Sequence, residues 1–157
     1  MKLIKRLLVL SDIHGLTYAA RRILLEQNAK TVIFLGDGLR EFELLQQDFP
    51  DREFFTVRGN NDFGLTAPDE SLELIAGKRV FFTHGHRYSV KHGLDDIKAA
   101  ARQRGADILL FGHTHIPFTE YDGGLCVMNP GAVCGIKPGY GFVDILEDKT
   151  VVLSVKN

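Results

Sequence analysis

Five short, mostly apolar runs in this chain each end on polar residues that stand beside a glycine, and this pattern limits the fold more than any other feature. The runs are rich in β-branched and aromatic side chains, which is typical of buried strands. Open α/β sheets bind ligands at the carboxyl ends of their strands. If these ends lie side by side, their polar side chains converge on one small volume. The five predicted strands span residues 7–10, 31–35, 54–57, 79–83 and 108–111.

The residues that follow the predicted strands carry carboxylate, imidazole and amide groups. Five of the six histidines of the chain are among them, so chance clustering is a poor explanation. The remaining one, His92, is expected at the surface near the start of a helix. The strand-end residues are Asp12, His14, Asp37, Asn60, Asn61, Asp62, His84, His86, His113 and His115.

This set of side chains favours a metal site. Carboxylate oxygen and neutral imidazole nitrogen together suit divalent Mn, Fe, Co, Ni and Zn, and the absence of cysteine from the set argues against a structural zinc site. Asp12 and His14 share a face if their segment is extended, so both can hold one ion. His113 and His115 also share a face if their segment is extended, but they face different ions if the loop turns between them. Asp37 is best placed to bridge two cations about 3.5–4 Å apart, a pair that polarises a phosphoryl oxygen and activates water.

Each motif alone has a simpler interpretation. Residues 12–14 and 36–38 read as ordinary polar turns after a strand, and residues 59–62 are rich in turn formers. The two histidines at positions 113 and 115 are more specific, because imidazoles that follow a buried strand are costly unless they are ligated or hydrogen-bonded. Taken together, the five groups favour the metal site.

The rest of the chain predicts an α/β fold. Helical spacing of apolar residues occurs over 18–27, 42–48 and 95–104, and Gly105 is placed to end the third helix. Residues 65–71 are expected to form a mobile surface loop. The order of elements predicts a sandwich of two mixed sheets flanked by helices, in a single domain over residues 1–157. Late strands joined by tight turns are predicted at 118–121, 125–128, 141–146 and 151–155.

Composition and charge exclude several classes of protein. A formal net charge of −1 with no block of Lys or Arg gives no strong nucleic-acid footprint. No apolar segment approaches the length of a membrane span, and the first apolar run is too short for a signal peptide. Cys126 and Cys134 have no disulfide or metal-binding spacing and are expected to be free thiols in a reducing compartment. We therefore expect a cytoplasmic protein.

The ordered motifs resemble the signature of the calcineurin-like metallophosphoesterase superfamily, which is D-x-H, G-D, G-N-H-[DE], H and G-H-x-H. The Thr83-His84-Gly85-His86 form, the Met128-Asn129-Pro130-Gly131-Ala132 stretch and the short length are similar to small bacterial and archaeal phosphodiesterases of the YfcE type. The resemblance covers essentially the full chain. The five motifs occur at residues 12–14, 36–37, 59–62, 84 and 112–115.

The resemblance implies a four-layer α/β/β/α sandwich that holds two divalent transition-metal ions, Mn in the first place, with Ni, Fe, Co or Zn as alternatives. It implies a phosphodiesterase in which a hydroxide that bridges the two metals attacks a small phosphate ester in line, without a covalent enzyme intermediate. Asp37 would bridge the two ions. The other implied ligands are Asp12, His14 and His115 for one metal, and Asn60, His84 and His113 for the other.

Residue 61 departs from the superfamily pattern. Many members have a histidine where this chain has Asn61, and that histidine is thought to protonate the leaving oxygen. Asparagine donates hydrogen bonds but is not a general acid, a function typically worth about 10²–10⁴-fold. We expect a modest enzyme that prefers good leaving groups, with His86 or Arg58 in partial compensation. His86 is expected to contact phosphate or to support a metal ligand rather than to bind metal itself, and Asp62 is expected to orient Asn60 or a neighbouring histidine.

The alternative is a catalytically weak or inactive scaffold on the same fold, similar to the retromer subunit of eukaryotic endosomes. Degraded metal ligands would mark such a protein, and here all seven candidate ligands are of the right type. A nuclease is disfavoured by the near-zero net charge, although short oligonucleotides and 2′,3′-cyclic nucleotides remain open as substrates. A homodimer is expected by analogy alone.

Overall fold

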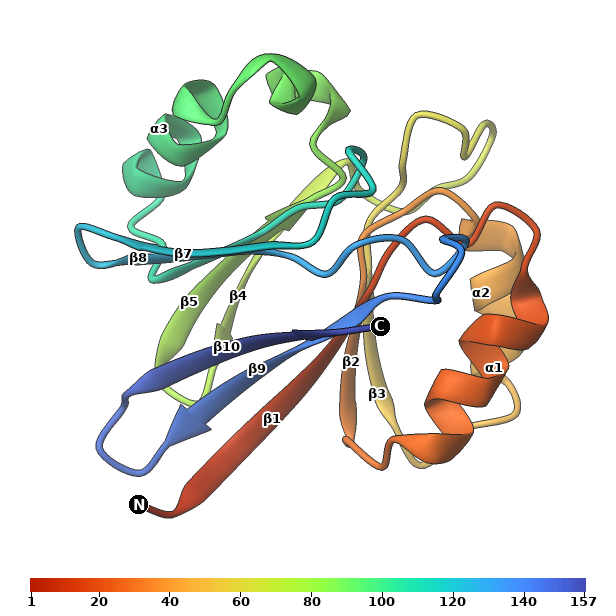
Figure 1. The fold of residues 1–157 in the computed structure, drawn as a ribbon, viewed down its shortest axis with the longest axis horizontal. Coiled ribbons are helices and arrows are strands. Elements are labelled where there is room, and N and C mark those ends of the chain that lie inside the picture. Colours follow the sequence, from red (N-terminus) through yellow and green to blue (C-terminus); the bar gives the residue numbers. More distant parts are fainter.

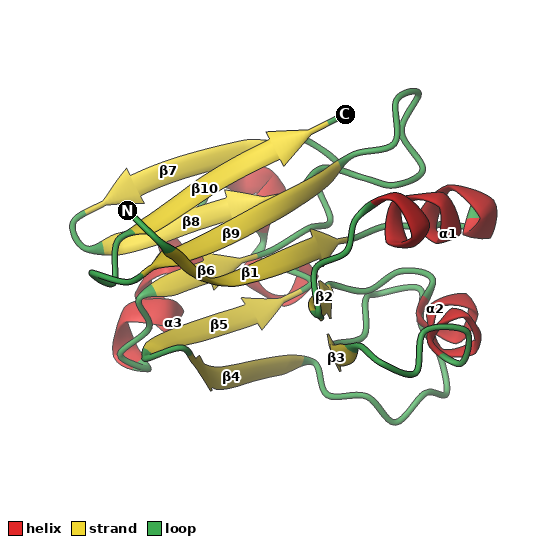
Figure 2. Ribbon diagram, turned by 90° about the horizontal axis from the view of Figure 1, so that it is seen from below, coloured by secondary structure: helices red, strands yellow, loops and turns green.

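The computed structural model describes residues 1–157. The strands are β1 (Leu3–Leu10), β2 (Thr31–Phe34), β3 (Glu53–Thr56), β4 (Glu70–Ile75), β5 (Lys78–Thr83), β6 (Ile108–Leu110), β7 (Phe118–Asp122), β8 (Leu125–Asn129), β9 (Tyr140–Leu146) and β10 (Val151–Lys156). The helices are α1 (Thr17–Glu26), α2 (Leu39–Gln46) and α3 (Asp95–Gln103), with short 3₁₀ turns η1 (His86–Tyr88) and η2 (Val90–His92). Two five-stranded sheets lie face to face, with α1 and α2 outside one sheet and α3 outside the other (Figures 1 and 2).

The strand order brings the predicted strand ends to one place. The first sheet runs β10-β9-β1-β2-β3 and the second runs β4-β5-β6-β8-β7. β1, β2 and β3 are parallel to one another, and so are β5, β6 and β8, so each set ends at one edge of its sheet. Several hydrogen bonds join the two edges. Among them, His84 Nδ1–H donates to Leu35 O at 2.8 Å, and His113 N–H donates to Asp12 Oδ2 at 3.2 Å.

Three apolar layers hold the sheets and helices together. The layer between the first sheet and its helices contains the stacked rings of Phe34 and Phe42, whose centroids are 4.4 Å apart. The layer between the two sheets contains Phe82, and the layer under α3 contains its neighbour Phe81. Successive residues of a strand face opposite sides of its sheet, so β5 is buried on both faces. The predicted four-layer α/β/β/α sandwich is confirmed.

The helix ends differ from the sequence prediction at one place that borders the site. α2 begins at Leu39 rather than at residue 42, because the Asp62 carboxylate accepts hydrogen bonds from the N–H groups of Gly38 and Leu39, each at 3.0 Å. This cap comes from a distant part of the chain. Gly105, with a φ of +68°, follows the end of α3 as predicted. None of the helices is both long enough and apolar enough to cross a membrane.

β4 is a strand that the sequence analysis did not predict. Its first two residues, Glu70 and Ser71, fall inside the expected loop 65–71, so the loop is shorter than predicted. β4 is an edge strand that pairs with β5 across the Ala76-Gly77 turn. Leu72 and Leu74 alternate with polar residues, which is the pattern of a half-buried strand, but in the fold both leucines are exposed.

Candidate metal centre

The strand-end side chains come together where the two sheet edges meet. Asp12 Oδ1 lies 3.3 Å from His14 Nε2 and 3.2 Å from His115 Nε2. Asp37 Oδ2 lies 3.3 Å from His84 Nε2 and 3.6 Å from His14 Nε2. Residues from the ends of β1, β2, β5 and β6 therefore face one another across a few ångströms, as the strand-end pattern predicts.

Two groups of potential ligand atoms share the carboxylate of Asp37. Within each group all ligand atoms lie within 4.8 Å of one another. A bond from a metal ion to nitrogen or oxygen is roughly 2.0–2.2 Å long, and two ligands of one ion are at most twice that distance apart. Each group therefore needs only small side-chain rotations to bind a cation. The groups are Asp12 with His14 and Asp37, and Asp37 with His84 and His113.

The donor set fits divalent cations. Asp12 and Asp37 are 0% and 2% exposed, and their ion pairs are all with histidines rather than with Lys or Arg. Two adjacent buried carboxylates without such partners are costly unless a cation neutralises them. Carboxylate oxygen with imidazole nitrogen is the donor combination that suits borderline transition metals.

The backbone of the centre is held in an uncommon conformation. Eight residues other than glycine have positive φ, and five of these are candidate ligands. Such conformations cost about 1–3 kcal/mol each and cluster at functional sites. Local backbone strain is therefore concentrated on the residues that face the site. The five residues, with φ between +43° and +69°, are Asp12, His14, Asp37, His113 and His115.

Two glycines allow the strand ends to approach each other. A Cβ atom at Gly112 would stand 2.1 Å from Ser11 Oγ and 2.9 Å from Asp12 Oδ2. A Cβ atom at Gly59 would stand 2.1 Å from Asp37 Oδ1. Any side chain at either position would displace a candidate ligand, so both glycines are required by the geometry of the site.

His84 is fixed in one tautomer. Its Nδ1–H donates to the Leu35 carbonyl, which leaves Nε2 facing the site. Burial alone would lower the pKa of His84, but the carboxylates of Asp37 and Asp12 outweigh it and raise that pKa. Burial alone would raise the pKa of Asp37, but hydrogen bonds from His84 and Asn61 hold it well below its usual range. Asp37 is thus ionised, and a cation would compete with a proton for His84 Nε2.

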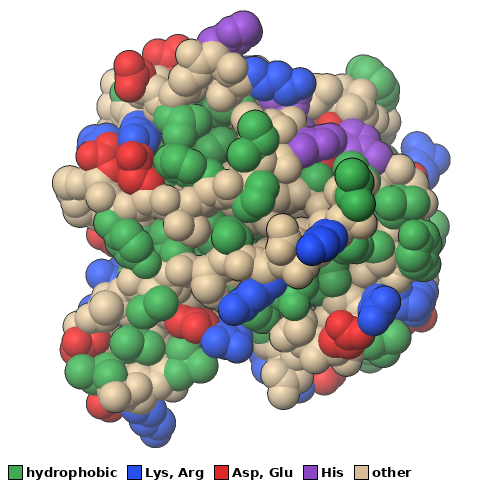
Figure 3. Space-filling view, viewed as in Figure 1, with side chains coloured by type: hydrophobic (Ala, Val, Ile, Leu, Met, Phe, Trp, Pro, Cys, Tyr) green, Lys and Arg blue, Asp and Glu red, His purple; other side chains and the backbone are tan.

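His113 is held in the neutral form that binds metals. Burial lowers its pKa to about 4, with further lowering by the charges of His84 and Lys91. Lys91 therefore places a positive charge close to the centre. Figure 3 shows histidine side chains gathered at one place on the surface, beside a Lys or Arg side chain.

Two supporting residues were not found by the sequence analysis. Ser11 Oγ–H donates to Asp12 Oδ2 at 2.5 Å and so fixes one carboxylate. Asn129 is fully buried, and its Nδ2 donates to Gly112 O at 3.1 Å and to Thr114 Oγ1 at 3.0 Å. These bonds hold the loop that carries both histidines after β6. The only sequence signals were the place of Ser11 directly before the first motif and the place of Asn129 in the family-like stretch.

The carboxylate of Asp62 joins the loop after β2 to the loop after β3. We expected Asp62 to orient Asn60 or a histidine, but its hydrogen bonds go to the backbone instead. Both oxygens are used, and all four bonds are between 2.7 and 3.0 Å long. Asp62 thereby positions the backbone of a candidate ligand. The donors are the N–H groups of Asp37, Gly38, Leu39 and Gly59.

Asp62→Asn is expected to lower the free energy of unfolding by about 2–4 kcal/mol. An amide has one acceptor oxygen in place of two, and hydrogen bonds to a charged group contribute about 1.5–3 kcal/mol each. Urea unfolding of metal-free protein measures the change. Asp148→Asn is the matched control, because Asp148 accepts the Thr150 N–H at an exposed turn and should change stability by less than about 0.5 kcal/mol. Equal losses in the two variants would contradict the joining role of Asp62.

Asn61 lies directly against Asp37. Its backbone N–H donates to Asp37 Oδ1 at 2.9 Å, and its Nδ2 donates to Asp37 Oδ2 at 3.0 Å. The residue at the usual general-acid position thus contacts the shared carboxylate. Asn60, the seventh predicted ligand, is exposed and lines a cavity of about 260 Å³ together with His86.

His86 and Arg58 line the same cavity but differ in their partners. The His86 ring centroid lies 5.5 Å from that of His84, and its buried Nδ1 has no hydrogen-bond partner. Burial lowers the pKa of His86, so its neutral imidazole is available to an incoming oxygen. Arg58 instead forms an ion pair with Asp69, in which Nε–H donates to Oδ1 at 2.8 Å. This pair stabilises the loop that precedes β4. Compensation for Asn61 by either residue stays a prediction.

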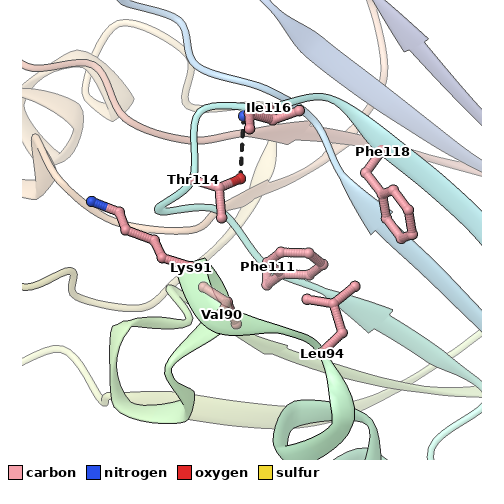
Figure 4. A pocket seen from close by; sticks show the side chains of 7 residues that line it. All are labelled: Val90, Lys91, Leu94, Phe111, Thr114, Ile116 and Phe118. Carbon is pink, nitrogen blue, oxygen red and sulfur yellow. Dashed lines mark hydrogen bonds between the residues drawn. The ribbon is translucent and has the colours of Figure 1, made fainter.

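Three larger cavities adjoin the centre. One, of about 350 Å³, is lined by His115 among others, and the remaining two differ in polarity. The first of these two, also of about 350 Å³, is mostly polar and is lined by His14 and Asn61 among others. The other, of about 410 Å³, is mostly apolar and reaches Thr114, the residue between two candidate ligands. In Figure 4 the side chains of Phe111 and Phe118 lie around this apolar cavity, while Lys91 points away from the rings.

Known proteins resemble this chain over most of its length. The calcineurin-like phosphoesterase superfamily domain matches residues 6–148. The chain is 31% identical to the probable metallophosphoesterase YsnB of Bacillus subtilis over an alignment of 126 residues. This alignment covers 80% of this chain and 73% of YsnB. It is 29% identical to the phosphodiesterase YfcE of Escherichia coli K12, over 96% of this chain and 97% of YfcE.

Other similar proteins have different names or show the fold alone. The chain is 28% identical to the vacuolar protein sorting-associated protein 29 of Schizosaccharomyces pombe, over 94% of this chain and 80% of that protein. The crystal structure of a predicted phosphoesterase from Streptococcus pneumoniae superposes with a TM-score of 0.76 at 22% identity, over 97% of both chains. Because the fold, the ordered motifs and the domain match over residues 6–148 agree, the chain belongs to the calcineurin-like phosphoesterase superfamily.

Proposed function

We propose that this protein is a metal-dependent phosphoesterase that hydrolyses phosphodiesters at a two-metal centre. The observation that carries the proposal is that one buried carboxylate, Asp37, belongs to two adjacent groups of ligand atoms. A shared carboxylate suits two cations about 3.5–4 Å apart, the spacing that clamps one phosphate ester. Preference for diesters is supported by the likeness to YfcE, which is named a phosphodiesterase.

The chain's own side chains divide into those that would hold metal and those that would contact the ester. Two bound cations would supply Lewis acidity to the phosphoryl group and activate water near neutral pH. The imidazole of His86 and the amide of Asn61 would donate hydrogen bonds to phosphoryl oxygens. The proposed ligands are Asp12, His14 and His115 for one cation, Asn60, His84 and His113 for the other, and Asp37 between them.

The apolar cavity would receive the organic part of the ester. Five of the seven residues that line it are hydrophobic, among them Phe111 and Phe118. Lys91 also lines it, and its charge lowers the pKa of His113, so a cationic group lies near both this cavity and the centre. The arrangement favours a phosphate diester that carries an aromatic or alkyl group, because apolar walls exclude water and the ammonium attracts the phosphate.

A scaffold function is the second candidate. It is favoured by Asn61, which removes the usual acid, and by the likeness to vacuolar protein sorting-associated protein 29. Strained backbone at five candidate ligands supports metal binding, but a scaffold can also bind metal. Turnover separates the two candidates.

Metal removal tests the proposed enzyme. Chelator-treated protein is expected to leave bis-p-nitrophenyl phosphate intact, and added Mn²⁺, Ni²⁺, Co²⁺ or Zn²⁺ is expected to restore hydrolysis. p-Nitrophenyl phosphate, a monoester with the same leaving group, measures the preference for diesters and should be cleaved more slowly. If none of the four metals restores hydrolysis, the proposed enzymatic function is rejected and the scaffold function is favoured.

A further inference from the structure

Cys134 lies beside the candidate ligands at the end of β1. It belongs to the loop between β8 and β9, and the backbone of this loop is bonded to that strand end. Val133 N–H donates to Ser11 O at 2.9 Å, and Cys134 N–H donates to Asp12 O at 3.0 Å. These bonds fix the backbone of Cys134 next to a candidate ligand, and its half-buried side chain is free of disulfide.

The Cys134 side chain reaches the same volume as two histidines. Its Sγ and the ligand nitrogens of His14 and His115 lie within 4.8 Å of one another. Two donors of one zinc ion are at most about 4.4 Å apart, the sum of one bond of roughly 2.3 Å to sulfur and one of roughly 2.1 Å to nitrogen, so the three atoms must move closer together to share an ion. Both histidines are exposed, which leaves their rings room to rotate toward such an ion. The other thiol, Cys126, packs against the apolar layer between the sheets and belongs to no such group.

We propose that the Cys134 thiolate is a further ligand of the cation held by Asp12, His14 and His115. On binding, the thiol gives its proton to solvent and Sγ donates an electron pair to the cation, so nothing is oxidised or reduced. The proposal rests on the proposed metal centre and concerns one of its two cations. Because thiolate is a soft donor, this cation is Zn²⁺, Co²⁺ or Fe²⁺ in preference to Mn²⁺.

Cobalt substitution tests for the sulfur ligand without reference to turnover. Full-length protein is freed of metal, reloaded with Co²⁺ in the presence of a phosphine reductant, and examined by absorption spectroscopy. The wild type should show visible d–d bands and a near-ultraviolet sulfur-to-cobalt charge-transfer band. Cys134→Ser should lose the charge-transfer band and keep the d–d bands, because the other ligands remain. Cys126→Ser, the matched control, should keep both.

The outcomes separate this proposal from the proposed function. A wild-type spectrum with d–d bands and no charge-transfer band overturns the sulfur ligand and leaves the metal centre in place. A spectrum with no d–d bands overturns both. A charge-transfer band that persists in Cys134→Ser also overturns the assignment. Competition binding gives a second readout: Cys134→Ser should weaken Zn²⁺ binding by roughly tenfold or more and leave Mn²⁺ binding unchanged, and equal effects on both metals would contradict it.

Discussion

Asp37→Asn is expected to abolish metal-dependent hydrolysis of phosphodiesters, with a fall in kcat of at least about 100-fold. Loss of a residue that only supports a metal ligand costs about 10–100-fold, and Asp37 belongs to both groups of ligand atoms. An amide has no charge and only one oxygen to donate, so it does not bridge two cations. The two hydrogen bonds from Asn61 would be disturbed as well, since they use both carboxylate oxygens.

The same variant should lose its stabilisation by metal. A ligand present at 100 times its Kd raises the free energy of unfolding by about 2.7 kcal/mol, so unfolding with and without Mn²⁺ measures binding independently of turnover. Asp51→Asn is the matched control, because Asp51 is an exposed carboxylate paired with Lys30 at 2.9 Å, and it should keep both properties. Turnover retained in Asp37→Asn would reject the two-metal proposal. If Mn²⁺ still raises the free energy of unfolding of Asp37→Asn while turnover is lost, the Asp37 carboxylate is needed for the reaction and not for metal binding.

The convergence of the candidate ligands could be predicted because each stands within a few residues of the end of a strand, and most of these strands are buried. Strands buried on both faces are continuous apolar runs, as in the Leu7–Leu10 part of β1, and such runs are visible in a sequence. Parallel pairing then brings their carboxyl ends to one edge. His84 follows β5 directly and Asp12 follows β1 after one residue, so local pattern and sheet geometry together place them.

Contacts between distant parts of the chain could not be predicted in this way. The start of α2 depends on Asp62, the tautomer of His84 on the Leu35 carbonyl, and the place of Cys134 on a backbone bond to Asp12. None of these leaves a local signal, because each partner alone is an ordinary turn or loop residue. Strained φ values are equally invisible, since they are imposed by the surrounding structure.

Asn61→His is expected to raise kcat/KM by about 10²–10⁴-fold for diesters with poor leaving groups, such as alkyl esters. Residue 61 is exposed and contacts the shared carboxylate, so a side chain there borders both the centre and solvent. An imidazolium can protonate a departing alkoxide, which an amide does not do, and general acid catalysis is worth this amount. p-Nitrophenolate leaves without a proton, so bis-p-nitrophenyl phosphate should gain little.

The pH profile distinguishes this acid from an indirect effect on Asp37. The gain requires a protonated imidazole, so it should be present at low pH and be lost as the pH rises through the pKa of that group, about 6.5 when unperturbed. Asn61→Gln keeps an amide without a titratable proton and should show neither the gain nor the new pH dependence. An equal rise for good and poor leaving groups in Asn61→His would instead mean that residue 61 acts by positioning the carboxylate of Asp37. Parallel rate measurements with the two classes of ester across this pH range therefore determine how much the asparagine lowers the rate of the proposed reaction.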